Sequence, residues 1–213
     1  MKHVFVLAVA AIAAGASAQL WNEQGDAGDL PGTAQLTMGS GPLNFISGTL
    51  GTNDADMYGI TVTDWSIFSA TTTGGVSFDT QLFLFTSGGM GIAFNDDSVG
   101  TTSTLPAGNA LYSGRTNGEQ VFLALSQFDK DPLSVGGAIF LDTPFNAVHG
   151  PDGPGGGSPI TGWDANGGSG GVYRITLTGA EFFSANPVPE PFTMGLGIAG
   201  LAVFARRRFK KSK

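Results

Sequence analysis

Short runs rich in β-branched and aromatic residues constrain the fold of this 213-residue chain more than any other feature. Gly, Asp, Asn and Thr separate the runs, and these residues favour turns between strands. Eight such runs are expected to form strands, at 43–50, 57–63, 66–73, 81–85, 91–95, 120–126, 137–142 and 172–178. Short strands at this spacing are typical of two packed antiparallel sheets.

The apolar residues in these runs alternate along the chain. In the run at 57–63, Tyr58, Ile60 and Val62 fall on one face, and the run at 172–178 repeats the pattern. Such alternation is typical of sheets with one buried and one solvated face. No sustained 3.6-residue period is present in this part of the chain. We therefore expect an all-β antiparallel sandwich or jelly-roll over residues 19–184.

One connection in this expected domain is long. Residues 143–171 are rich in Gly and Pro and contain few residues that a core would bury. A connection of this length inside a domain is usually functional or mobile. We expect a loop here, with Ile160 and Trp163 as the side chains available to hold it against the sandwich.

The N-terminus predicts export. Lys2 precedes an unbroken apolar stretch at 4–14, and Ala16-Ser17-Ala18 is a small-residue cleavage site. This combination indicates a secretory signal peptide over residues 1–18, cleaved after Ala18.

The charge of the exported part is strongly negative. Residues 19–191 contain three basic and 17 acidic residues, a net charge of −14. A surface this acidic repels phosphate backbones, so nucleic acid is excluded as a partner class, whereas divalent cations remain possible. Solubility is the simpler explanation of the charge.

Catalytic motifs are not found in the sequence. There is no cysteine, and His149 is the single histidine after the signal peptide. No nucleophile elbow, zinc-protease motif, P-loop or dinucleotide fingerprint is present. We therefore expect a non-enzymatic protein without a required cofactor.

Acidic and amide side chains gather at the ends of several expected strands. These residues are Asp54, Asp56, Asp79, Asn95, Asp96 and Asp97. Two interpretations stay open. The side chains either accept backbone N–H groups and stabilise turns, or converge to bind calcium, which prefers six to eight oxygen ligands.

The same stretch resembles a known domain family. The order "DADMYGITV", "FDTQLFLF" and "NDDS" is similar to the bacterial pre-peptidase C-terminal β-sandwich family, over roughly residues 45–128. Asp56 and Tyr58 match its Asp-x-Tyr strand, and Asp79 and Leu82 match its second strand. Its Asn-Asp-Asp turn is matched by Asn95, Asp96 and Asp97. The closing strand differs, because "GEQVFLALSQF" replaces the usual more aromatic one. The resemblance implies a non-catalytic accessory module, and some such modules bind calcium or extracellular polysaccharide.

The C-terminus predicts a membrane segment. A Pro-rich linker at 185–191 precedes an uncharged, mainly apolar run at 192–205, and a basic tail follows at 206–213. A 14-residue helix is about 21 Å long, shorter than a hydrocarbon core of about 30 Å. The basic tail predicts a cytoplasmic C-terminus, so the acidic domain lies outside.

These C-terminal features resemble the PEP-CTERM sorting signal of Gram-negative bacteria. The residues that carry the likeness are Val188, Pro189, Glu190, Pro191, Arg206, Arg207 and Arg208. The resemblance implies recognition by an exosortase-type enzyme in bacteria that make exopolysaccharide. It also implies transient anchoring in the inner membrane, followed by release to the cell surface or extracellular matrix.

Overall fold

The structure is a computed structural model that describes residues 19–185. The expected signal peptide with its cleavage site at Ala16 and Ala18 lies outside the described residues. So do the sorting motif at 188–191, the apolar run at 192–205 and the basic tail. Within the described part, no helix is long and apolar enough to cross a membrane.

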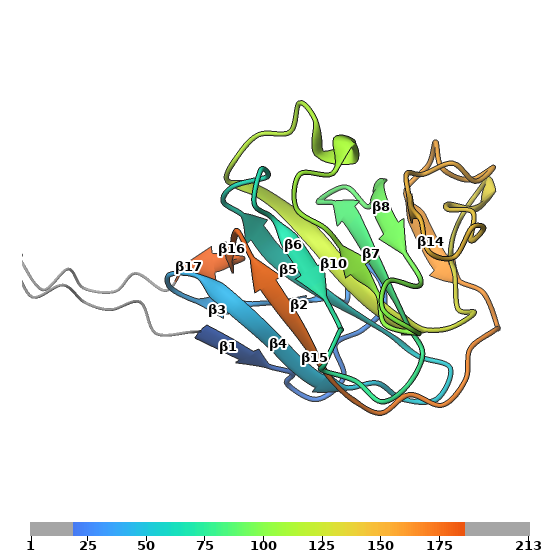
Figure 1. Cartoon of the computed structure of the whole chain (residues 1–213), viewed down its shortest axis with the longest axis horizontal. Helices are drawn as coiled ribbons and strands as arrows, with labels where there is room; N and C mark the ends of the chain where they lie inside the picture. Colours follow the sequence, from blue (N-terminus) through green and yellow to red (C-terminus); the bar gives the residue numbers. More distant parts are fainter. Residues whose placement is uncertain (1–18, 186–213) are drawn as a thin grey trace, which may run out of the picture.

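Two large sheets form the body of the molecule (Figure 1). The five-stranded sheet has the order β1 (Gln19–Asn22), β4 (Leu43–Thr49), β15 (Val172–Thr178), β6 (Ser69–Thr71) and β9 (Thr104–Leu105). All its pairs are antiparallel except β1 with β4.

The seven-stranded sheet is the central layer of the fold. Its order is β13 (Val148–His149), β8 (Gly91–Asn95), β7 (Thr80–Thr86), β10 (Glu119–Gln127), β5 (Ala55–Val62) and β16 (Ala180–Phe182), with β2 (Gln35–Leu36) also pairing with β5. The pairs are antiparallel apart from β2 with β5.

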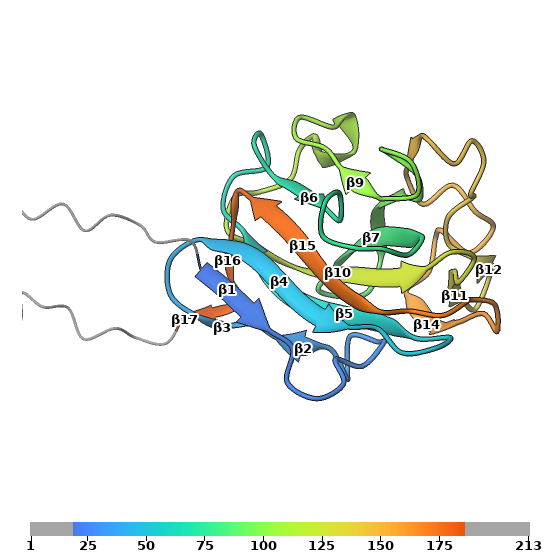
Figure 2. The same ribbon diagram turned by 60° about the horizontal axis from the view of Figure 1, so that its bottom comes forward.

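Smaller elements complete the structure. A third sheet has the order β12 (Gly137–Ala138), β11 (Pro132–Ser134) and β14 (Ile160–Trp163). Strand β17 (Ser184–Ala185) pairs with β3 (Met38–Gly39), and Ala110–Tyr112 forms a 3₁₀ turn, η1. Strands β1 and β17, which hold the first and last described residues, lie at one end of the long axis, and β14 lies at the other (Figure 2).

The main core lies between the two large sheets. Tyr58, Ile60 and Val62 of β5 face Tyr173 and other apolar residues of the five-stranded sheet, and all are buried. The two sheets thus pack face to face, as in a β-sandwich. Burial along β15 alternates as its sequence predicts. The all-β, largely antiparallel fold is confirmed.

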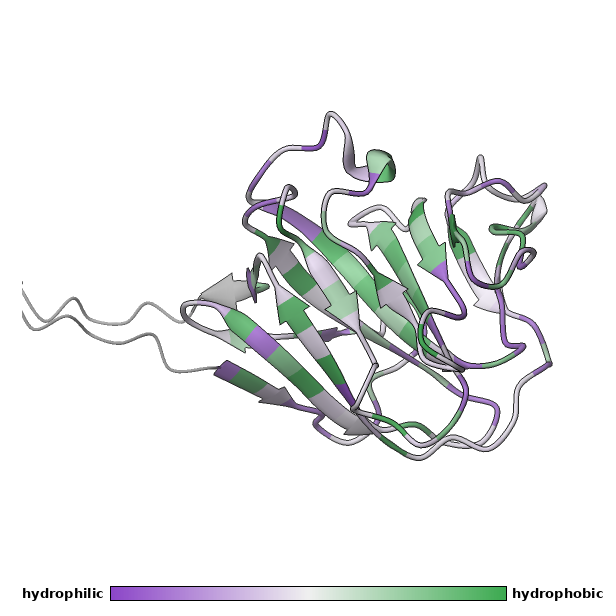
Figure 3. Cartoon of the chain, viewed as in Figure 1, coloured by the Kyte–Doolittle hydropathy of each residue, from purple (hydrophilic) through white to green (hydrophobic). Residues whose placement is uncertain are grey.

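A second core covers the opposite face of the seven-stranded sheet. Phe83, Phe85 and Phe94 project from β7 and β8 into a cluster that includes Ile139 and Phe140. The third sheet and its flanking loops supply the cover. The central strands are therefore apolar on both faces, as Figure 3 shows. The expectation of one solvated face is wrong for this sheet.

Most expected strands form, and two are much shorter. The run at 66–73 yields only β6, because Asp64 accepts hydrogen bonds from the backbone and hydroxyl of Ser66 and holds a turn. The run at 137–142 yields only β12, because Ile139 and Phe140 leave the strand to enter the second core.

The segment 143–171 is not a loop throughout. It contains β13 and β14, and β14 pairs with β11. Ile160 is buried in the second core, and the Trp163 indole N–H donates to the Asp29 carbonyl at 2.7 Å. The two side chains expected to hold this segment do so. At the next boundary, Ala185 belongs to β17 instead of opening the linker.

Candidate metal centres

Acidic side chains collect at one end of the seven-stranded sheet. Strands β5 and β7 begin there, and β8 and β10 end there. Cross-strand pairing places Asp56 opposite Leu125, Leu125 opposite Leu82, and Leu82 opposite Asn95. With strands about 4.8 Å apart, Asp56 and Asn95 lie about 14 Å from each other. The six residues expected to converge therefore share one sheet end but do not form a single site.

Three acidic triads occupy this region, and in each triad one oxygen per residue lies within 4.8 Å of the others. The first triad is Glu23, Asp26 and Asp56; the second is Asp79, Asp96 and Asp97; the third is Asp129, Asp131 and Asp142.

The first triad joins the N-terminal segment to the sandwich core. Parallel pairing of β1 with β4 brings Glu23 beside the start of β5, and the Glu23 carboxylate accepts from Ala27 and Thr49 backbone N–H groups at 3.1 and 2.8 Å. Asp26 follows three residues later, and its carboxylate accepts a hydrogen bond from the Gly28 backbone N–H at 3.4 Å. Asp56 completes the triad from β5.

Asp56 is the most unusual member of the first triad. Its side chain is fully buried, and its Oδ2 accepts from the Tyr173 hydroxyl at 2.6 Å. That hydroxyl is also hydrogen-bonded to Tyr58. The other oxygen, Oδ1, is buried and has no hydrogen-bond partner within residues 19–185. Burial raises the pKa of Asp56 to about 8 in spite of the Tyr173 hydrogen bond, and Glu23 adds repulsion.

Gly48, which has no side chain, makes room for the Tyr173 hydroxyl and the Glu23 carboxylate. A Cβ atom on Gly48 would collide with the Tyr173 hydroxyl and with the Glu23 carboxylate. The surface outside Glu23 is concave and lined by Asn22, Gly25, Gly48 and neighbouring residues of β4. An ion from solvent therefore has an open approach to Glu23.

Two of the expected ligands have structural roles instead. Asp54 accepts backbone N–H groups from Gly51 and Ala55 at 2.9 Å each, which stabilises the turn before β5. The Asn95 side chain donates to the carbonyls of Asp97 and Ala147 and accepts from the Thr104 N–H. The turn interpretation fits Asp54 and Asn95.

The second triad lies where β7 begins and β8 ends. Asp96 is buried, with 1 % exposure, and its Oδ1 has no hydrogen-bond partner among the described residues. Asp79 also has a buried oxygen without a partner. Burial raises the pKa of Asp96 to about 8, with a further contribution from Asp97 and Asp79.

The third triad differs from the other two. Asp131 accepts a hydrogen bond from the Gln81 amide at 3.2 Å. Burial raises the pKa of Asp131 to about 7, and Asp142 adds to the shift. Among the described residues, however, no oxygen of this triad is both buried and without a partner.

Within residues 19–185, no lysine or arginine side chain forms an ion pair with these triads. The described part contains three Lys and Arg residues. Arg115 pairs with Glu119, the Lys130 ammonium donates to Asn53 and to the Asp164 carbonyl, and Arg174 lies over Phe45. Because a buried charge without a counterion is costly, burial favours protonated carboxyl groups in the triads when no cation is bound.

Sequence reasoning missed Glu23, Asp26 and the third triad. Glu23 and Asp26 lie about thirty residues before Asp56, and only the pairing of β1 with β4 brings them together. The visible signal was the acidic, Gly-rich stretch "NEQGDAGD" at 22–29, which lies next to none of the expected strands. Asp129 and Asp131 follow the expected strand at 120–126, and Asp142 ends the expected strand at 137–142, so the signal that selected the other strand-end residues was present here as well.

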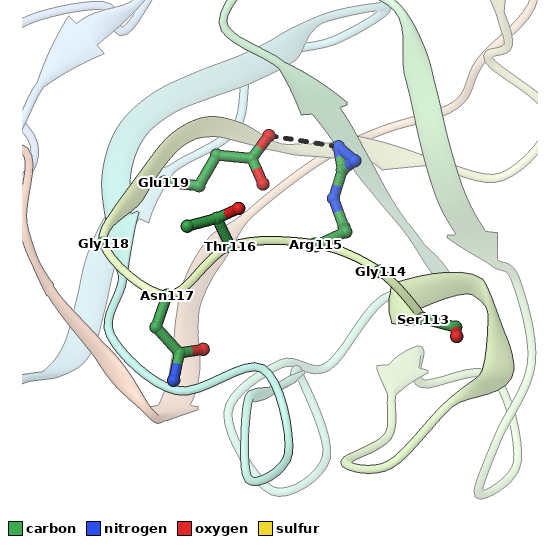
Figure 4. Close-up of a pocket in the computed structure, with 7 residues that line it drawn as sticks. All are labelled: Ser113, Gly114, Arg115, Thr116, Asn117, Gly118 and Glu119. Atoms are coloured by element: carbon green, nitrogen blue, oxygen red, sulfur yellow. Dashed lines mark ion pairs between the residues drawn. The ribbon is translucent and has the colours of Figure 1, made fainter.

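Two other features combine polar side chains that could serve catalysis, namely His149 with Asp152 and the concavity at residues 113–119. His149 contacts Asp152 at 3.0 Å through Nδ1, but its Nε2 lies 3.1 Å from the Pro144 carbonyl. Both ring nitrogens are therefore occupied in holding this loop. The concavity in Figure 4 is lined by residues 113–119, and its two charged side chains, Arg115 and Glu119, pair with each other at 3.4 Å.

Comparison of the chain with family models, curated proteins and solved structures found no match.

Proposed function

We propose that this chain is an exported, non-enzymatic β-sandwich module that binds calcium through Glu23, Asp26 and Asp56. The observation that carries the proposal is the environment of Asp56. Its side chain is buried, its Oδ1 has no hydrogen-bond partner among the described residues, and one of its carboxylate oxygens lies within 4.8 Å of oxygens from Glu23 and Asp26. A hard divalent cation satisfies such an oxygen and offsets the repulsion among the carboxylates.

The donor set fits calcium in its chemistry. All three side chains offer carboxylate oxygens, and calcium completes its coordination with backbone carbonyls and water. The bound ion would compensate the negative charge that burial otherwise disfavours at Asp56. Glu23 would connect the ion to the N-terminal segment, and Tyr173 would orient Asp56 from β15. Calcium would then link β1, β5 and β15.

Thermal unfolding with calcium and with chelator tests this function. At calcium about 100 times its dissociation constant, one site adds about 2.7 kcal/mol. For a domain of this size that corresponds to a rise in Tm of roughly 5–10 °C. Asp56→Asn should reduce the rise and leave the chelated protein at least as stable, whereas exposed Glu181→Gln should keep the full rise. An equal rise in wild type and Asp56→Asn would contradict the proposal.

We also propose delivery to the cell surface or matrix through the C-terminal segment. The support is the order of Pro189-Glu190-Pro191, the apolar run at 192–205 and the basic tail, together with the signal sequence. In this proposal an exosortase-type enzyme recognises the segment while it is held in the inner membrane.

A reporter fusion tests the sorting step. Residues 185–213 are attached to an exported reporter, in hosts with and without an exosortase-type enzyme. Processing only in the host with the enzyme supports the proposal, and identical processing in both hosts contradicts it. A matched fusion with Pro189 and Pro191 replaced by Ala should remain unprocessed in both.

A further inference from the structure

The end of β8 is built differently from an ordinary polar turn. The Asn95 side chain makes three hydrogen bonds to the backbone, at 2.7–3.0 Å, and fixes the path of the chain. In the next residue, Asp96, the carboxylate Oδ1 is buried and has no hydrogen-bond partner among the described residues, although short acidic side chains in turns usually accept nearby N–H groups.

Burial makes this arrangement unfavourable in the absence of an ion. Asp96 is 99 % buried, and one of its oxygens lies within 4.8 Å of oxygens from Asp79 and Asp97. Asp79 contributes a second buried oxygen without a partner. Three ionised carboxylates this close repel one another, and a cation between them removes the repulsion without protonation of the buried group.

We propose that Asp79, Asp96 and Asp97 bind a second calcium ion, independent of the ion at Glu23, Asp26 and Asp56. The ion joins the start of β7 to the end of β8. Three carboxylates supply part of the oxygen coordination that calcium requires, and carbonyls or water supply the rest. The site does not rest on the first one, because the two share no residue.

The second ion would also stabilise two neighbouring segments. The Phe128 N–H donates to the Asp79 carbonyl at 3.2 Å, and the Asp97 N–H donates to the Phe145 carbonyl at 3.0 Å. Both phenylalanines are exposed, and their rings contact each other edge to face with centroids 5.8 Å apart. Binding at the triad would therefore rigidify the backbone that carries this aromatic pair.

Calcium titration of the full-length chain by calorimetry, with Asp96→Asn and Asp56→Asn variants, tests the second site. Each substitution should lower the number of bound calcium ions by one, and the double variant should lower it by two. Glu181→Gln is the control and should leave the number unchanged. In chelator, Asp96→Asn should melt at or above the wild-type temperature, because the amide carries no buried charge.

The outcomes separate the two sites. An unchanged number of bound ions in Asp96→Asn overturns the second site and leaves the first intact. An unchanged number in Asp56→Asn overturns the first site and leaves the second intact. If Asp96→Asn does not fold, Asp97→Asn replaces it, and the number of bound calcium ions should again fall by one.

Hydrogen exchange gives an independent readout of the second site. Calcium should slow exchange of the Phe128 and Asp97 amides in wild type and in Asp56→Asn, but not in Asp96→Asn. Equal protection in Asp96→Asn and wild type overturns the assignment to this triad.

Discussion

At the scale of single residues, Gly48 permits the first triad to form. Its lack of a side chain lets the Tyr173 hydroxyl and the Glu23 carboxylate approach the same point above β4. Asp56 then reaches Tyr173 from the opposite sheet. A small residue in one strand thereby sets the geometry of three side chains from three other elements.

Gly48→Ala should lower stability by roughly 1–3 kcal/mol, the usual cost of overpacking. It should also weaken calcium binding, because Glu23 must move. Denaturant unfolding and calcium titration measure the two effects. Gly157→Ala is the matched control, since a Cβ there meets nothing within 4 Å. Equal behaviour of the two variants would show that Gly48 is not required.

The buried carboxylates predict an unusual dependence of stability on pH. Asp56 and Asp96 have pKa values raised from 3.8 to about 8 by burial. Between these values the folded chain without calcium holds protons that the unfolded chain has released. The free energy of unfolding therefore falls as pH rises through this window.

Thermal unfolding at pH 5.5 and pH 8 checks this pH dependence. In chelator the protein should melt at a lower temperature at pH 8, and saturating calcium should remove most of the difference. The double variant Asp56→Asn/Asp96→Asn should show a smaller pH effect in chelator. A chelated wild-type protein that is more stable at pH 8 would contradict the assigned burial.

At the scale of elements, β14 shows that the Gly/Pro-rich segment is structural. Ile160 enters the second core, while Thr161 on the same strand is exposed. Ile160→Ala should lower stability by about 2–4 kcal/mol. Thr161→Ala should change it far less, as denaturant unfolding would measure. Similar small effects for both would mean that the segment contributes little to the core.

Strand prediction succeeded where local pattern and tertiary burial agree. β8 and β15 have the expected bounds, because alternating residues of β15 face one core and turns flank both strands. Strand prediction failed for Ile139 and Phe140. Their residue types are typical of a strand, but both lie outside β12 and their side chains pack in the second core. No local pattern distinguishes a paired apolar run from an unpaired buried one.

The two-residue strands were also beyond sequence reasoning. Strands β3 and β17 pair across about 145 residues, and β2 pairs with β5 through only two residues. Such pairings depend on which edges remain open after the large sheets form. Their sequences carry too few residues to show a period.

At the scale of the whole molecule, the acidic residues are clustered in space instead of evenly distributed. Nine of the 17 acidic residues belong to the three triads. The sequence predicted the acidic character and the strand ends that carry Asp56, Asp79, Asp96 and Asp97. It did not predict their division into separate triads, because the division depends on the order of strands in the sheet.

The proposed calcium sites also predict that sodium chloride and calcium differ in their effect on Tm. Monovalent salt at 0.15 M screens exposed charges over about 8 Å but has little effect on buried ones. Sodium chloride in chelator should therefore recover only a minor part of the calcium-dependent rise in Tm. A full recovery by sodium chloride would assign the rise to general screening.

Diffraction from crystals of the protein grown with calcium tests the central claim most directly. The anomalous signal of calcium should give a peak about 2.3–2.6 Å from carboxylate oxygens of Glu23, Asp26 and Asp56. The Asp56 oxygen that otherwise has no partner should be among them. No peak at this position with calcium far above its dissociation constant, and Asp56 bonded to a protein donor instead, would contradict it.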